Sequence, residues 1–297
     1  MDIKALITFQ TIIKQGSFQG AAEELNYVQS TVTSQIQKLE LDLGVKLFER
    51  GRKLRLTEAG RILTKQAAYI LNDIDSLRKT ISDFTEGETG NLRIGSMEPT
   101  ASLRLPNVLN DYCNDHKKVQ INLEIGNSTT IRERILSGQL DLGICTSPDI
   151  EMGLDFTPLF VEKIGLLLPV DHKLVMKNDI KAKDLQGERL ILTGRNCAYR
   201  RKLEKLLLEK GNHVMPIVQS GSIEVVKKLV EKGLGIGIIP EVSHEFTSTT
   251  VLKSINDFEL DVTIGLLKRK DESPSRAMQN LINAITISLK RSDCMVM

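Results

Sequence analysis

Residues 21–56 restrict the possible fold more than any other part of the chain. The segment reads AAEELNYVQSTVTSQIQKLELDLGVKLFERGRKLRL, which predicts a short helix, a tight turn and a second helix, followed by a basic turn. The second helix begins with small hydroxyl and amide side chains, and arginine and lysine residues follow its end. Such an order of groups presents hydrogen bonds to base edges and cations to the neighbouring phosphates. We therefore expect a helix-turn-helix that binds duplex DNA.

The second of these helices has one apolar and one polar face. Val28, Val32, Ile36, Leu39 and Leu43 recur at spacings of four, four, three and four residues, so we expect all five to point inward. On the polar face, glutamine can bond adenine, while serine and threonine reach base edges or phosphate. For any single side chain, a solvated polar face is the alternative. The predicted DNA contacts on this helix are Gln29, Ser30, Thr33, Ser34 and Gln37.

Positive charge is concentrated after this helix. The whole chain has a net charge of only +2, but residues 46–65 hold seven lysines and arginines against two glutamates. Gly44 is expected to end the helix, and residues 46–56 to form a two-stranded wing with its tip near Gly51. At the tip, Arg52 and Lys53 are predicted to contact phosphate or the minor groove. A solvated basic loop would be the better interpretation if no helix-turn-helix preceded it.

A long helix is predicted to follow the wing. From Glu58 to about Thr85 there is no proline, and Gly60 is the only glycine. Apolar residues recur there with the alternating spacing that is typical of a seam between paired helices. Because no partner helix adjoins it in sequence, we expect it to pair with a second copy of the chain; packing onto the chain's own domains is the alternative. The seam residues are Leu63, Ala67, Ile70, Ile74, Leu77, Ile81 and Phe84.

Short apolar runs alternate with helical stretches after residue 88. Alternation of this kind is typical of parallel α/β sheets. The two halves of this region look alike, since LDLGIC and GLGIGIIP each follow a predicted helix. We expect two α/β lobes with a small-molecule cleft between them. Other strand-like runs are LRIGS, INLEIG, KIGLLLPV, RLILTG, MPIVQS and VTIGLLKR, and the helical stretches lie at about 101–113, 128–137, 199–210, 222–232 and 274–290.

At this point the chain resembles the LysR-type transcriptional regulators. The resemblance is carried by FQTIIKQGSFQGAAEELNYVQSTVTSQIQKLELDLGVKLFERGRKLRLTEAG at 9–60, which is long and specific. It is carried more loosely by LRIGSMEPTASLRLP at 92–106, LDLGI at 140–144 and LVEKGLGIGIIP at 229–240. One departure is Ser34, where many members carry arginine, so no arginine contact is expected there.

The resemblance implies an α/β protein overall. Its parts would be an N-terminal winged helix-turn-helix, a long linker helix for dimerisation, and a two-lobed α/β effector-binding domain like the type 2 periplasmic binding proteins. The expected partners are double-stranded promoter DNA, a small-molecule effector, a second copy in a homodimer or homotetramer that bends DNA, and RNA polymerase if the protein is an activator. No other cofactor is expected. The expected boundaries are 1–58 for DNA binding, 59–88 for the linker and hinge, 89–161 with 266–297 for the first lobe, and 162–265 for the second lobe.

Effector contacts are expected on loops after strands and at helix starts, where exposed N–H groups attract anions. A small organic acid is therefore the expected effector. For each serine or threonine, an ordinary helix cap is the alternative role. The resemblance favours Ser96, Thr100, Thr129 and Thr146. The full set of predicted effector-binding residues is Ser96, Glu98, Thr100, Ser128, Thr129, Thr146, Thr193, Asn196, Cys197, Tyr199, Arg200 and Ser222.

Two members of this set carry sharper hypotheses. Arg200, in the first turn of a predicted helix, could bind a carboxylate with its forked guanidinium, and a surface arginine is the alternative. Cys197 beside it could have a lowered pKa and sense oxidants. Peroxide-sensing members of the family use a pair of cysteines in this region, whereas Cys145 is the only plausible distant partner here. We favour a small buried hydrophobic role for Cys197.

Other classes of protein fit less well. The four histidines are scattered outside any nucleophile or metal motif, and no phosphate-binding fingerprint occurs, so an enzyme is not expected. A solute-binding protein would explain residues 91–290 but not the first 90, and the N-terminus lacks a signal-peptide pattern. No apolar run is long enough to span a bilayer. The four cysteines form no CxxC pair, which fits reduced thiols. We expect a cytoplasmic regulator without a membrane partner.

Overall fold

The computed structural model describes residues 2–49, 54–86, 90–148, 153–212, 215–245, 247–270 and 273–293. Two compact units make up the chain. One comprises Met1–Gly87 with the short segment Leu136–Gln139, and the other comprises Glu88–Ile135 with Leu140–Met297. We describe each unit by itself.

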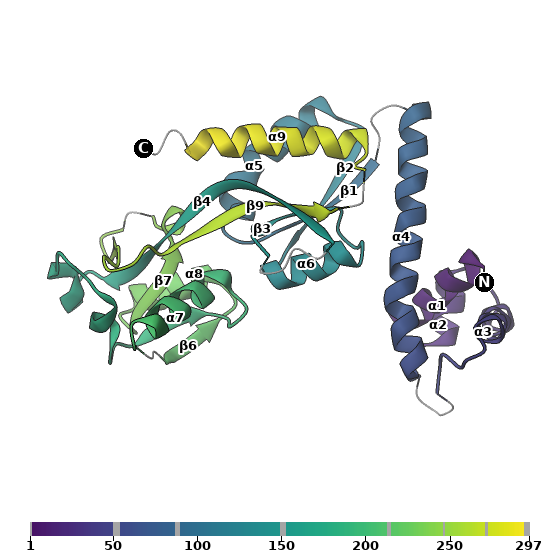
Figure 1. Ribbon diagram of the computed structural model, residues 1–297, viewed down its shortest axis with the longest axis horizontal. Coiled ribbons are helices and arrows are strands. Elements are labelled where there is room, and N and C mark those ends of the chain that lie inside the picture. The colour runs from purple at the N-terminus through teal and green to yellow at the C-terminus, as the bar shows by residue number, and fades with distance from the viewer. Residues whose placement is uncertain are drawn as a thin grey trace. The chain divides into compact units, whose positions relative to one another are not determined.

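The first unit begins with three short helices, α1 (Ile3–Gln15), α2 (Phe18–Glu24) and α3 (Gln29–Leu43) (Figure 1). Local sequence signals define their ends. The hydroxyl of Ser17 accepts a hydrogen bond of 3.0 Å from the backbone N–H of Gly20 and so caps the start of α2. Gly44 ends α3 with φ at 68°, a left-handed conformation that glycine adopts without strain. The predicted helix end at Gly44 is confirmed.

One apolar cluster holds these helices together. It contains Phe9 and Ile12 of α1, Ala21 of α2, and Val32, Ile36 and Leu39 of α3, all of them buried. The prediction that Val28 and Leu43 also face inward is wrong, because their side chains are 67% and 37% exposed. Both lie at the ends of the helix, and Val28 precedes its first turn. The helical spacing of apolar residues continues past the part of α3 that α1 and α2 cover, so it predicts burial for two residues that are exposed.

The wing after α3 is short in the described residues. Phe48 and Leu56 form an isolated antiparallel bridge, and the N–H of Glu49 donates a hydrogen bond of 2.9 Å to the carbonyl of Arg55. The predicted wing tip at 50–53 lies outside the described residues. Thr57 then fastens the wing to the next helix: its hydroxyl donates to the carbonyl of Lys46 at 2.7 Å and accepts from the N–H of Gly60 at 3.0 Å.

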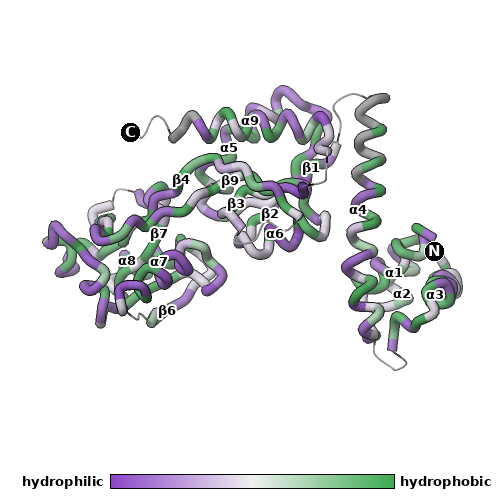
Figure 2. Tube along the Cα trace, in the orientation of Figure 1, coloured by the Kyte–Doolittle hydropathy of each residue, from purple (hydrophilic) through white to green (hydrophobic). Residues whose placement is uncertain are grey.

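Helix α4 runs from Glu58 to Glu86, 29 residues, as the seam pattern predicts. Its first half packs on its own unit, with Ala67 buried and Leu63 against the core cluster. Further along, Ile70, Leu77 and Ile81 are 36%, 59% and 56% exposed. Figure 2 shows the resulting alternation of hydrophobic and hydrophilic positions along this helix. The alternative of packing onto the chain's own domains is confirmed for the first half, whereas pairing of the exposed second half with another copy stays a prediction; the Phe84 side chain lies outside the described ones.

The second unit is built on two sheets that share long strands. In the first lobe the strand order is β2-β1-β3-β9-β4, and in the second it is β4-β7-β5-β6 with β8 paired to β4. The strands are β1 (Gly90–Ser96), β2 (Val119–Ile125), β3 (Leu142–Thr146), β4 (Leu154–Pro169), β5 (Leu190–Thr193), β6 (Pro216–Ser220), β7 (Ile236–Pro240), β8 (Thr250–Lys253) and β9 (Asp261–Arg269).

Strands β4 and β9 connect the lobes (Figure 1). They pair antiparallel with each other, and β4 continues into pairing with β7 and β8. The parallel sheets that we expected are therefore mixed: β1 pairs parallel with β2 and β3, and β5 with β6 and β7. The first half of β4 and the whole of β8 were not predicted. The predicted lobe boundaries at 161/162 and 265/266 fall inside β4 and β9.

Five α-helices cover the sheets in the described part of this unit. Tyr112 of α5 donates a hydrogen bond of 2.7 Å to the carbonyl of Ala277 in α9, which joins these two helices of the first lobe. In the second lobe, Val226 and Val230 of α8 are buried against Ile191 and Ile239. The helices are α5 (Leu105–Asp115), α6 (Ser128–Leu136), α7 (Ala198–Glu209), α8 (Ile223–Glu231) and α9 (Arg276–Asp293). Among the described residues, none of the helices has the length and apolar character needed to cross a bilayer.

Candidate functional site

The first candidate site is the outer face of α3. Gln29, Ser30, Ser34 and Gln37 are exposed there, as the polar pattern predicts. Thr33 is half-buried, and its hydroxyl donates a hydrogen bond of 2.9 Å back to the carbonyl of Gln29. Four side chains on this face thus remain available to base edges or phosphates, while the Thr33 hydroxyl would have to exchange its helix bond for a DNA contact.

Glu40 positions α3 relative to the wing. It is buried on the inner side of the helix, accepts a hydrogen bond of 2.9 Å from the N–H of Leu47, and forms an ion pair of 2.6 Å with Lys46. Burial opposes its charge, but the bonds from Lys46 and from the backbone of Leu47 and Phe48 outweigh burial and lower the pKa of Glu40 below 4.5. A charged Glu40 therefore fixes the base of the wing against the recognition helix.

Arg52 and Lys53 lie outside the described residues, so their predicted phosphate contacts stay predictions. The described flanks of the wing carry cations as well. Arg55 is exposed, and the Lys46 side chain is 66% exposed even though it pairs with Glu40. Positive charge therefore borders α3 on the wing side, which suits a phosphate backbone.

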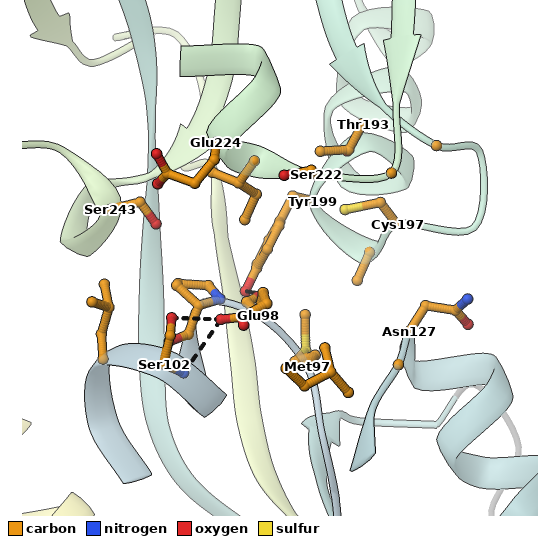
Figure 3. A pocket seen from close by; sticks show the side chains of 18 of the residues that line it. Met97, Glu98, Ser102, Asn127, Thr193, Cys197, Tyr199, Ser222, Glu224 and Ser243 are labelled. Atoms are coloured by element: carbon orange, nitrogen blue, oxygen red, sulfur yellow. Dashed lines mark hydrogen bonds between the residues drawn. The ribbon is translucent and has the colours of Figure 1, made fainter. Parts of the chain in front are cut away.

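The second candidate site is a cavity of about 750 Å³ between the two lobes of the second unit (Figure 3). This volume is typical of a site for a small organic molecule. Its walls come from the turn after β1, the start of α6, the starts of α7 and α8, and the turn after β7. Several helix starts therefore face one enclosed space, because the parallel strands of each lobe end at this edge.

The turn after β1 crosses the floor of the cavity. Here the carboxylate of Glu98 accepts a hydrogen bond of 2.6 Å from the hydroxyl of Ser102, and a weaker one of 3.3 Å from its N–H. From the other lobe, the phenol of Tyr199 donates a bond of 3.4 Å to the carbonyl of Glu98. Burial, followed by the nearby Glu162 carboxylate, raises the pKa of Tyr199 well above 10. The phenol is therefore a neutral donor between the lobes.

The cavity brings together seven of the twelve predicted effector residues. They come from both lobes and include the cap positions of two helices, Cys197 before α7 and Ser222 before α8. Neither of these two side chains makes a capping hydrogen bond. The capping alternative therefore does not account for Ser222. The seven residues are Glu98, Ser128, Thr193, Asn196, Cys197, Tyr199 and Ser222.

Four other predicted residues lie behind or beside the cavity wall. Ser96 and Thr100 are fully buried, and the hydroxyl of Ser96 donates to the carbonyl of Met97. Thr146 donates a hydrogen bond of 2.8 Å to the hydroxyl of Ser128 and so supports a residue that does line the cavity. Thr129 is half-buried and is not part of the lining. In this conformation none of these four residues lines the cavity.

Arg200 also lies outside the lining, although its charge made it a prime candidate. Its side chain is only 4% exposed. Its guanidinium donates to the carboxylate of Glu204 at 2.6 Å, and to the carbonyl of Thr193 and the amide oxygen of Gln219 at 3.0 Å each. Arg200 therefore neither faces the cavity to bind a ligand carboxylate nor lies on the surface, so neither of the two predicted roles describes it. Arg200 ties the start of α7 to β5 and β6.

Sequence reasoning missed about half of the polar lining. Asn127 caps α6 through a hydrogen bond of 3.0 Å from the N–H of Thr130, and Ser102 holds Glu98. Ser243 follows β7, in a turn that carries no motif. Glu224 and Lys227 are three residues apart on α8, and this spacing could have predicted an ion pair at the start of that helix. The missed polar residues are Ser102, Asn127, Glu224, Lys227, Ser243 and Glu245.

The charge of the lining is negative. Among the described residues, the lining has the three carboxylates of Glu98, Glu224 and Glu245 and one cation, Lys227. The Lys227 ammonium is paired with Glu224 at 2.8 Å and with Glu245 at 3.3 Å. Burial opposes its charge, but these two carboxylates outweigh burial and raise the pKa of Lys227 above 10.5. Lys227 is thus already neutralised by the protein.

Cys197 and Cys145, the two cysteines of the redox hypothesis, are both free thiols. Cys197 is partly exposed at the cavity, whereas Cys145 is fully buried in β3. Burial raises the pKa of the Cys145 thiol to about 12, so very little thiolate is present at neutral pH. The only partner that the sequence suggested for Cys197 is therefore a buried thiol with little thiolate character.

A helix-turn-helix with an exposed polar face, in one chain with a two-lobed ligand cavity, defines a DNA-binding protein with a small-molecule sensor domain. Comparison with known families agrees. Residues 3–61 match the bacterial regulatory helix-turn-helix protein family of LysR type, and residues 85–289 match the LysR substrate-binding domain. The chain belongs to the LysR family of transcriptional regulators.

Individual relatives span nearly the whole chain. The transcriptional regulator YtlI of Bacillus subtilis is 36% identical over 96% of this chain and 94% of its own length. Two solved structures share the fold. CbnR in complex with its target DNA has a TM-score of 0.70 at 21% identity, covering 98% of this chain and 100% of CbnR. The effector-binding domain of QuiR in complex with shikimate has a TM-score of 0.64 at 20% identity, covering 69% of this chain and 99% of that domain.

Proposed function

We propose that this regulator binds promoter DNA as a homodimer or homotetramer and that a small molecule in the inter-lobe cavity modulates the binding. The observation that carries this proposal is the cavity itself, which has the volume of a metabolite site and polar groups from both lobes. The proposed effector contacts are Glu98, Ser128, Thr193, Asn196, Cys197, Tyr199 and Ser222. A regulator that acts on promoters works in the cytoplasm, and contact with RNA polymerase follows if it activates.

Self-association is supported by the second half of α4. Ile70, Leu77 and Ile81 continue the apolar seam but are exposed in the single chain. A second copy of the same helix would remove this apolar surface from water. The paired N-terminal domains would then reach two half-sites on one face of the duplex.

Effector control requires a ligand that prefers one arrangement of the subunits. A ligand in the cavity contacts both lobes, so it changes how the lobes pack between subunits. That change alters the spacing of the DNA-binding pairs and hence the DNA bend. The coupling free energy equals the difference in ligand affinity between the two arrangements, so a ligand without such a preference has no effect.

A gel-shift experiment with the full-length protein and the DNA upstream of its own gene tests this function. We expect binding that weakens steeply with salt, because lysines and arginines release counterions from phosphates. Arg52→Ala with Lys53→Ala should weaken binding to every sequence and lower the slope of log K against log salt by about 2. The control is Lys205→Ala with Lys210→Ala, which removes the same charge from the second unit. An unchanged slope in the wing variant would contradict the phosphate assignment.

A further inference from the structure

The effector cavity has two chemically different sides. In Figure 3, Ser102, Ser243 and Glu224 lie on one side of the Tyr199 ring, and Thr193, Cys197 and Asn127 lie on the other. The first side carries the Glu224 carboxylate, and Glu98 lies near the middle. Glu245 is linked to Glu224 because both pair with the Lys227 ammonium. On the second side are the starts of α6 and α7, where the first backbone N–H groups carry partial positive charge, although Asn127 already accepts from one of them, the N–H of Thr130.

A simple organic anion fits this lining poorly. Three carboxylates face one ammonium, and that ammonium already pairs with two of them. Arg200, which could have held a carboxylate, is buried outside the lining and donates to Glu204, Thr193 and Gln219. Helix starts can receive a carboxylate, but the remaining negative charge calls for a cation on the ligand itself.

Two polar groups of the acidic side have unused acceptor capacity. Glu98 receives the N–H and the hydroxyl of Ser102 on a single carboxylate oxygen, Oε2. Ser243 is only 6% exposed, and its hydroxyl has no hydrogen-bond partner among the described residues. In Figure 3 this hydroxyl points toward the space between Glu224 and Ser102. A buried hydroxyl without a partner is costly, and a donor supplied by a ligand would remove that cost.

We propose that the effector is an amino-acid-like zwitterion whose ammonium group is held by Glu98 and the Ser243 hydroxyl, with its carboxylate at the starts of α6 and α7. The ammonium supplies three N–H donors, which match a carboxylate and a hydroxyl oxygen that can both accept. The proposal rests on the proposed function, since it names the chemical class that the same cavity takes. It also replaces the simple organic acid expected from the sequence.

Matched ligand pairs test the proposal on the purified full-length protein by isothermal titration calorimetry. After a first screen of the common L-amino acids by thermal shift, each binder is compared with the acid that lacks its amino group, for example L-leucine with 4-methylpentanoate and L-glutamate with glutarate. Shikimate serves as an additional carboxylate without an amine. We expect at least one amino acid to bind at least about tenfold more tightly than its amine-free counterpart, about 1.4 kcal/mol.

Three variants assign that preference to the acidic side. Glu98→Gln keeps an acceptor for Ser102 but removes the charge, so the tenfold preference should vanish. The matched control Glu133→Gln removes a carboxylate exposed on α6 of the same lobe, outside the lining, and should preserve it. Ser243→Ala should raise the thermal midpoint of the ligand-free protein, because an unsatisfied hydroxyl is removed, yet weaken amino-acid binding several-fold.

The result overturns the proposal if amine-free acids bind as tightly as their amino partners, if Glu98→Gln retains the preference, or if none of the amino acids binds. Gel-shift affinity for the upstream DNA is measured on the same variants without ligand. If DNA binding is intact and any of those outcomes occurs, the zwitterion proposal is rejected while the proposed regulatory function is not. Loss of DNA binding by the wild-type protein would instead reject the proposed function.

Discussion

The phenol of Tyr199 and the backbone carbonyl of Glu98 form a hydrogen bond of 3.4 Å between the two lobes. The ring belongs to the first turn of α7, and the carbonyl to the turn after β1. The same contact therefore spans the cavity and joins two of its proposed ligand-binding walls. Any ligand that draws the lobes together or apart must act on this bond.

Tyr199→Phe removes the bond while keeping the buried ring. We expect the urea midpoint of the second unit to fall by an amount equivalent to about 0.5–1.5 kcal/mol. Since burial raises the pKa of this phenol well above 10, the hydroxyl stays protonated in the folded protein. The difference between wild type and variant should therefore be constant from pH 6 to 9, and a difference that changes across this range would contradict a neutral donor.

Glu40→Gln should destabilise the DNA-binding domain at neutral pH. The lowered pKa of Glu40 means that the charged form stabilises the fold at pH above its ordinary value of 4.5, and that this contribution is lost as the pH falls below that value. We expect a loss of about 1–3 kcal/mol at pH 7, typical of hydrogen bonds to a charged group. Thermal unfolding between pH 3 and 7 should show the difference shrinking toward low pH.

Lys46→Gln is the matched variant for Glu40. It removes the exposed member of the ion pair but leaves the bond between Glu40 and the Leu47 N–H. Exposed pairs contribute little, so we expect a loss below about 1 kcal/mol. An equal loss in both variants would mean that the ion pair, and not the backbone bond, fixes the wing.

Gly60→Ala should destabilise the junction between the wing and α4. A Cβ atom at this position would clash with the carbonyl oxygen of Leu47, which also accepts hydrogen bonds from Thr57. Because the clashing oxygen belongs to the backbone, the backbone must shift, at a cost of about 1–3 kcal/mol. Glu58→Ala, an exposed change two residues away, should cost less than about 0.5 kcal/mol in the same denaturation experiment. Equal effects would remove the steric explanation.

Arg200→Met should lower stability without changing which ligands bind. The substitution leaves the carbonyl of Thr193 and the amide of Gln219 without their donor inside the second lobe. We expect a loss of about 1–3 kcal/mol, measured by urea denaturation of the full-length protein. The relative affinities of an amino acid and its amine-free counterpart should stay as in wild type. A selective loss of carboxylate binding would restore Arg200 to the effector contacts.

Local patterns in the sequence determined the short-range features. Ser17 and Gly44 set helix ends through their own hydrogen bonding and backbone freedom, so no distant residue is needed to predict them. The buried stripe of Val32, Ile36 and Leu39 follows from helical periodicity alone. The apolar runs of β3, β5 and β7 follow from burial on both faces, since every residue of these strands is buried, and this again is visible locally.

Tertiary structure alone decided which side chains meet. Val28 continues the apolar spacing of α3, yet nothing packs over it, because burial depends on the neighbouring helices and not on the helix itself. Arg200 has the position of a ligand contact in sequence, but Gln219 and Glu204 engage its guanidinium. Ser243 lies 145 residues after Glu98 (243 minus 98), and the two residues belong to different lobes. They line one cavity only because strands β4 and β9 connect the two lobes. Contacts between distant segments depend on how the strands pair, and the local spacing of apolar residues does not specify which strands become neighbours.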